Sequence, residues 1–187
     1  MNTPQFVSDC LAAARETDSA RLVSDLVGKV IADPDAVFES LGSPEVGKIE
    51  RIHVCDDLTV INVIWPPLMT ILPHNHNMWA VIGVYCGRED YIFWRRTEEG
   101  TGRQVEAAGA RSLGPGDVQM LGANAIHSVT NPVSEYTGAI HVYGGNFFEQ
   151  ERSEWDPQSL MEQPYDIERN VQRFENENAV AALRAKS

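Results

Sequence analysis

Two histidines separated by one residue, His74 and His76, are the part of this sequence best suited to chemistry. They open an apolar run that extends from Pro73 to Gly87 and reads as one strand. Residues i and i+2 of a strand point to the same face, so the two imidazoles are expected to project together. Neutral imidazole is the commonest metal ligand in proteins. The pair predicts part of a metal site; the alternative is two surface histidines at a strand edge.

Three further histidines fall in segments that read as strands. His127 lies in a short segment of this kind, and His141 opens the last strand with Tyr143 two residues further on. His141 and Tyr143 therefore share one face of that strand. His53 lies in the first strand, where we interpret it as a core residue whose ring is satisfied by neighbours.

Composition and charge limit the kinds of molecule that this protein is expected to bind. The chain has 187 residues, a net charge of −12 and a pI near 4.7. An acidic protein repels nucleic acid and anionic lipid, so neither is expected as a partner. The three cysteines are widely scattered and form no metal-binding pair or disulfide framework. The N-terminus lacks the pattern of a secretion signal, and no apolar run approaches the roughly 20 residues of a membrane span. We expect a cytoplasmic protein.

The periodicity of apolar residues predicts helices at both ends of the chain. Residues 3–32 have helical spacing, with a break at Asp18–Ser19, and Pro34 begins a short helix that ends at Gly42. Near the C-terminus, Trp155 lies in a predicted loop and 166–184 form a predicted solvated helix. We expect one domain over 1–187, divided into a helical part (1–47), a β-barrel (48–148) and a loop with a C-terminal helix (149–187).

Between these helical parts the rhythm changes to period two. Many short strands without intervening helices predict an all-β antiparallel barrel or jelly roll. The strands are expected at 48–54, 58–65, 73–87, 88–96, 103–108, 110–113, 118–121, 126–130 and 137–143.

Two motifs within this region resemble those of the cupin superfamily. His74, His76 and Gly87 match the first cupin motif, although its glutamate position holds Ala80. In the second motif, His127 and Asn131 match a histidine and an asparagine four residues later, whereas the position of the turn glycine holds Asn124. Residues 114–117 resemble the turn that commonly precedes this motif. The resemblance covers about residues 48–148. It implies an RmlC-like cupin fold, a double-stranded β-helix (jelly-roll barrel), and metal ligands at His74, His76 and His127.

Among cupins, the closest resemblance is to bacterial cysteine dioxygenase-like enzymes, which hold their metal with three histidines alone. Their last barrel strand carries serine, histidine and tyrosine at alternate positions, where this chain has Ala139, His141 and Tyr143. Three neutral imidazoles leave the full 2+ charge and open positions on the metal, which suits iron(II), O₂ and a thiolate. The resemblance thus implies an iron(II) thiol dioxygenase that converts a small cysteine-like or mercapto-acid thiol to its sulfinate. Zinc or nickel could replace iron in the purified protein.

The resemblance also implies roles for residues around the metal. Tyr143 would hydrogen-bond substrate or oxygen, and His141 would orient the Tyr143 hydroxyl, although Ala139 leaves no evident group to orient His141. Arg51 occupies a position similar to that of the arginine that binds the substrate carboxylate in this family. Three rival arginines are Arg88, Arg95 and Arg96.

Two other classes of function stay open. One is a cupin with zinc, nickel or manganese that acts as an isomerase, lyase or hydrolase. The other is a non-enzymatic sensor that binds a small ligand. We expect a small thiol and O₂ as partners of a monomer or homodimer. The lack of a carboxylate at position 80 favours thiol oxidation over the first class, and the His141–Tyr143 pair favours an enzyme over the second.

Overall fold

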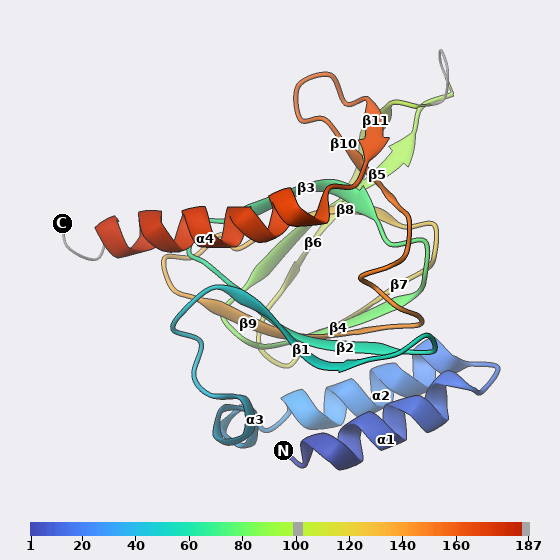
Figure 1. Ribbon diagram of the computed structural model, residues 1–187, viewed down its shortest axis with the longest axis vertical. Coiled ribbons are helices and arrows are strands. Elements are labelled where there is room, and N and C mark those ends of the chain that lie inside the picture. The colour runs from blue at the N-terminus through green and yellow to red at the C-terminus, as the bar shows by residue number, and fades with distance from the viewer. Residues whose placement is uncertain (99–102, 185–187) are drawn as a thin grey trace.

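Two antiparallel sheets face each other in the computed structural model, which describes residues 1–98 and 103–184 (Figure 1). Within these residues, one sheet has the order β1-β2-β9-β4-β7 and the other β11-β10-β3-β8-β5-β6. The strands are β1 (Lys48–Val54), β2 (Thr59–Trp65), β3 (Thr70–Asn75), β4 (Ala80–Cys86), β5 (Glu89–Arg96), β6 (Val105–Leu113), β7 (Val118–Leu121), β8 (Ile126–Thr130), β9 (Thr137–Tyr143), β10 (Ser153–Trp155) and β11 (Glu162–Pro164).

The chain crosses repeatedly from one sheet to the other between β3 and β9. Strands β3, β5, β6 and β8 belong to one sheet, whereas β4, β7 and β9 belong to the other. This topology confirms the predicted cupin double-stranded β-helix. Apolar side chains from both sheets fill the space between them and form one cluster, which includes Ile61, Ile82, Tyr91 and Val129. Alternation along each strand directs these residues inward.

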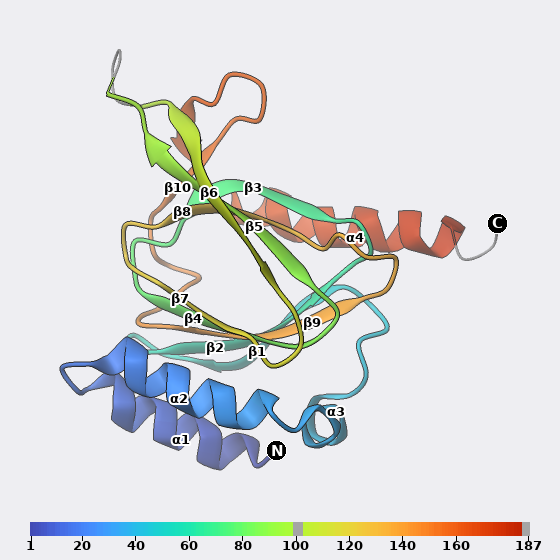
Figure 2. The same cartoon turned by 180° about the vertical axis from the view of Figure 1, so that it is seen from behind.

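Three helices cover the outer face of the five-stranded sheet (Figure 2). They are α1 (Thr3–Ala14), α2 (Ser19–Ile31) and α3 (Pro34–Leu41), and the predicted break at 18–19 lies between the first two. Val27 and Ile31 of α2 pack so closely on β4 that a Cβ at Gly83 would lie 2.4 Å from Val27. The missing side chain at Gly83 therefore allows α2 to approach the sheet.

The prediction of one strand from Pro73 to Gly87 is wrong. β3 ends at Asn75 and β4 begins at Ala80, because Asn77 has a left-handed backbone (φ 55°) that turns the chain toward the other sheet. Asparagine tolerates this conformation better than most residues. The predicted break between 103–108 and 110–113 is also absent: β6 is continuous, and the strand pairing absorbs one register shift opposite Phe93 and Trp94.

The C-terminal part is more ordered and more buried than expected. Trp155, predicted in a loop, belongs to β10 and is fully buried, with its indole N–H donating to the Arg103 carbonyl at 3.1 Å. Helix α4 (Ile167–Arg184) is not simply solvated, since Phe174 packs on Trp65 with ring centroids 5.5 Å apart. It lies on the side of the barrel opposite α1 and α2 (Figure 1). Among the described residues, no helix is both long and apolar enough to cross a membrane.

Candidate metal centre

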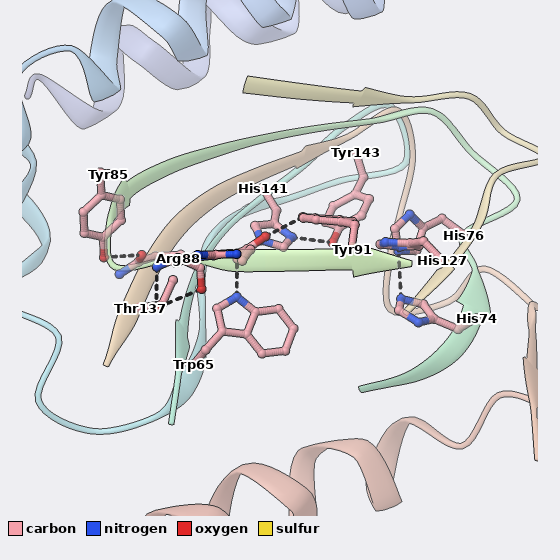
Figure 3. A network of polar contacts seen from close by, with 12 residues as sticks. Trp65, His74, His76, Tyr85, Arg88, Tyr91, His127, Thr137, His141 and Tyr143 are labelled. Carbon is pink, nitrogen blue, oxygen red and sulfur yellow. Dashed lines mark hydrogen bonds and ion pairs between the residues drawn. The ribbon is translucent and has the colours of Figure 1, made fainter. Parts of the chain in front are cut away.

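The three histidines predicted to bind metal converge inside the barrel (Figure 3). His74 lies on β3, directly opposite His127 on β8, and His76 lies in the turn that follows β3. The Nε2 atom of His76 is 3.2 Å from that of His74 and 3.3 Å from that of His127. All three side chains are buried. Sequence spacing joined His74 to His76, but only the pairing of β3 with β8 brings in His127.

The geometry and donor set of this group fit a divalent metal ion. The Leu72 carbonyl accepts a hydrogen bond from His74 Nδ1 at 2.8 Å, so the proton of the neutral ring is on Nδ1 and Nε2 is free to coordinate. Metal–nitrogen bonds of about 2.0–2.1 Å place neighbouring ligand nitrogens about 2.8–3.4 Å apart for angles between octahedral and tetrahedral. The two observed separations fall in this interval. Among the described residues, no carboxylate joins the group.

Burial keeps these histidines in the form that binds metal. Loss of solvation lowers the pKa of His74 to about 4. The pKa values of His76 and His127 lie well below the ordinary value of 6.5 for the same reason, with neighbouring imidazoles adding to the effect. All three rings are therefore neutral near pH 7.

These lowered pKa values predict that acid destabilises the metal-free protein. The unfolded chain binds a proton at His74 near pH 6.5, but the folded chain does so only near pH 4. The free energy of unfolding should therefore fall as pH is lowered through this window, by about 1.4 kcal/mol per pH unit for one histidine. Urea denaturation of metal-stripped wild type and of His74→Asn at each pH isolates the contribution of His74 to the free energy of unfolding. The contributions of the carboxylates, which both proteins share, cancel in the difference. A stability difference between the two proteins that is constant from pH 7 to pH 4 would contradict the prediction.

His141 and Tyr143 lie beside the three histidines. The Tyr143 hydroxyl is 2.9 Å from His141 Nδ1, and its ring meets the His76 ring edge-on at a centroid distance of 5.0 Å. Burial raises the pKa of Tyr143, so the hydroxyl keeps its proton at neutral pH. Both residues predicted from the last barrel strand are thus at the site (Figure 3).

The arginines singled out from sequence lie elsewhere. Arg51 is exposed, stacks on the Phe148 ring at 3.8 Å and does not line the cavity around the histidines. The three rivals form ion pairs with carboxylates on the protein surface: Arg88 with Asp90, Arg95 with Glu106 and Arg96 with Glu162. His53 is half-buried rather than in the core, with Nε2 3.3 Å from Cys55 Sγ.

A cation that sequence reasoning missed, Arg152, lies next to the histidines. Its guanidinium is held between the rings of Phe147 and Tyr165, at 4.0 Å and 4.3 Å from their centroids. Nη1 donates to the Phe147 carbonyl, while Nε and Nη2 are buried without a hydrogen-bond partner among the described residues. Its charge contributes to the lowered pKa values of His74 and His76. No periodic pattern marks Arg152, because it precedes β10 in a polar segment.

The space around the histidines is small and closed by aromatic side chains. The cavity has a volume of about 40 Å³, and its lining includes His141, Tyr143, Phe147, Tyr165 and Phe174. An open cleft of about 840 Å³, lined partly by Arg152 and Tyr165, lies on the outer side. Tyr165 lines both spaces, so it marks the boundary between solvent and the histidine group.

Fold and site together define the class: a double-stranded β-helix barrel with a buried three-histidine group able to hold a divalent metal. No protein-family model matches the chain. An RmlC-like cupin family protein from Methanocaldococcus jannaschii is similar at 10% identity and a TM-score of 0.45, over 56% of this chain and 85% of that one.

Two similar structures carry named activities. The DMSP lyase DddQ from Ruegeria pomeroyi is 19% identical over 52% of this chain and 43% of its own, with a TM-score of 0.40. Oxalate decarboxylase from Bacillus subtilis is 17% identical over 51% of this chain and 22% of its own, also at 0.40. The matched part of this chain covers less than half the length of either. Because these TM-scores are below 0.5, neither activity transfers to this chain.

Proposed function

We propose that this protein is an iron(II)-dependent thiol dioxygenase that converts a small thiol bearing a carboxylate into its sulfinate. The observation that carries the proposal is a neutral three-histidine group with a tyrosine hydroxyl beside it and no carboxylate ligand among the described residues. Bound iron(II) would supply open coordination positions for a thiolate sulfur and for O₂. The overall reaction, RSH + O₂ → RSO₂H, balances without another reductant, since sulfur is oxidised and both oxygen atoms end on it.

The surrounding residues provide a hydrogen bond at the metal site, bind the substrate carboxylate and exclude water. Tyr143 offers a hydrogen bond beside the metal ligand His76, and His141 holds that hydroxyl. The free Nε and Nη2 of Arg152 bind the substrate carboxylate, since arginine presents a planar fork of donors to such a group. Phe147 and Tyr165 exclude water from around this ion pair.

We expect Arg152→Gln to weaken substrate binding more than turnover. Hydrogen bonds to a charged group contribute about 1.5–3 kcal/mol, which corresponds to a roughly 10- to 100-fold higher KM. Arg51→Gln is the matched control, because it removes the same charge from an exposed side chain outside the cavity, and its KM should stay within about twofold of wild type. A larger KM effect at Arg51 would assign the carboxylate to Arg51 instead.

Metal content and O₂ consumption together test the function. The protein is purified, its metals are quantified, and the iron-loaded form is given a panel of small thiols with and without a carboxylate. One O₂ consumed per thiol, with a sulfinate product, is expected for at least one thiol acid. Iron-loaded protein that oxidises no thiol would contradict the proposal. A cupin isomerase, lyase or hydrolase, or a small-ligand sensor, would then be the alternative.

A further inference from the structure

Glu89 is a carboxylate with no exposed surface, at the start of β5. Its neighbours Arg88 and Asp90 point outward and pair with each other at 2.7 Å. Glu89 shares the inner face of the strand with Tyr91. A buried carboxylate is costly unless hydrogen bonds and a positively polarised partner compensate it. Surface carboxylates help to keep a protein soluble, but a carboxylate inside the barrel does not. The position of Glu89 therefore indicates another role.

Three side chains that Figure 3 labels, Trp65, Tyr91 and His141, converge on this carboxylate. Trp65 Nε1 donates to Oε1 at 2.6 Å, and the Tyr91 hydroxyl donates to Oε2. His141 Nε2 lies 3.6 Å from Oε1, is buried and has no hydrogen-bond partner within the described part of the chain. That separation exceeds an ideal hydrogen bond, as is common at catalytic pairs before substrate binds. His141 is thus placed between Glu89 on one ring nitrogen and Tyr143 on the other.

The acceptor oxygens of Glu89 determine where the ring proton of a neutral His141 lies. Indole N–H groups only donate, and burial together with Glu89 raises the pKa of Tyr91, so both oxygens of Glu89 act as acceptors. The Tyr143 hydroxyl, 2.9 Å from His141 Nδ1, is able either to donate to that atom or to accept from it. Glu89 selects between these two arrangements: the ring proton belongs on Nε2, directed at the carboxylate, and Nδ1 accepts from Tyr143. A bare Nε2 would place its lone pair against a carboxylate oxygen.

We propose that Glu89 is a positioning residue that holds His141 in the tautomer with its proton on Nε2. Nδ1 then accepts from Tyr143 and aims that hydroxyl beside His76. Ala139, two residues before His141, has no hydroxyl for this task, and Glu89 performs it from a different strand. The link extends to the metal ligands through Tyr91, whose ring stacks on His127 at a centroid distance of 5.4 Å. The tautomer stands independently of the proposed function, while its effect on turnover rests on that function.

Nuclear magnetic resonance of ¹⁵N-histidine-labelled protein tests the tautomer directly. Long-range ¹H–¹⁵N spectra of the metal-free and zinc-loaded wild type show which ring nitrogen of His141 carries the proton, and His141→Asn assigns its signals. A proton on Nε2 is expected. A proton on Nδ1, or rapid averaging between the two nitrogens, would overturn the proposal. This measurement needs no variant at Glu89 and holds even if such variants fold poorly.

Two variants separate the carboxylate from its surroundings. Glu89→Leu should abolish the single tautomer, whereas Tyr91→Phe, which removes only the donor to Oε2, should leave it intact. A His141 tautomer unchanged in folded Glu89→Leu would also overturn the proposal.

Measurements of kcat and KM on Glu89 variants then test whether the tautomer of His141 affects the reaction. Glu89→Leu should lower kcat about 10²-fold with KM unchanged, and Glu89→Gln, whose amide oxygen still accepts from Nε2, should restore most of the loss. In a Tyr143→Phe background Glu89→Leu should cost less than about threefold, because residues that act as one unit are not additive. A full additional loss there would contradict a role through Tyr143. If no thiol is oxidised, the proposed function fails, and the tautomer still decides the role of Glu89.

Discussion

The His127→Ala protein should lose its metal almost completely. Removing one of three ligands leaves two imidazoles, and even changes in the groups that orient ligands cost about 10- to 100-fold in metal affinity, so we expect more than a 100-fold loss. Iron per chain, measured after desalting by elemental analysis, should fall close to zero. The same result is expected for His74→Ala and His76→Ala, because all three nitrogens face one point.

His53→Ala is the matched control for this prediction. His53 is half-buried near Cys55 and does not line the histidine cavity, so its removal should leave iron content unchanged. Thermal unfolding of each metal-stripped variant shows whether the barrel remains intact. Full iron occupancy in folded His127→Ala would refute the assignment of the three ligands.

Tyr143→Phe should reduce turnover by about 10²- to 10⁴-fold while the protein keeps its fold and its metal. The change removes one hydroxyl, which is 2.9 Å from His141 Nδ1, and leaves the ring in its packing against Phe147. The loss should appear in kcat, since the ring still fills its place in the cavity. O₂ uptake with saturating thiol measures it.

Tyr85→Phe provides the control for a buried tyrosine. Its hydroxyl donates to Asn62 at 2.9 Å, and its ring packs among the residues beneath α2 rather than in the metal cavity. Loss of that hydrogen bond should lower stability by about 0.5–1.5 kcal/mol without changing kcat. A Tyr143→Phe variant as fast as wild type would rule out a role for this hydroxyl.

Much of the architecture could be predicted from sequence because local patterns carry it. Period-two alternation from Lys48 onward located most strands, and proline, glycine and capping residues marked the N-terminal helices. Errors arose where the pattern was locally continuous but the chain turned, as at Asn77, whose left-handed backbone divides the predicted strand. The apolar run begins only at Met78, beyond the turn, and its closeness in sequence to His74 and His76 made the two segments read as one strand.

The C-terminal segment was misjudged because its partners are distant in sequence. Trp155 lies in a short polar stretch that has no periodicity of its own, and it is buried by packing with Val105 of β6 and Ile126 of β8. Phe174 is one of few apolar residues that α4 buries, and its partner Trp65 lies on β2. Contacts of this kind leave no signal in a local window.

For the site, the sequence alone identified the candidate residues. His74 and His76 followed from strand spacing, and His127, His141 and Tyr143 followed from their places in motifs. Only the tertiary structure decided which charged groups surround them. Arg152 lies beside the histidines because the segment before β10 folds back over the open end, and Glu89 reaches His141 because β5 and β9 belong to opposite sheets that enclose one interior. The sequence did contain one sign of Glu89: it is a charged residue on the same strand face as Tyr91. Its partner across the barrel could not be read from spacing, because distance along a chain does not specify which inward side chains of two facing sheets meet.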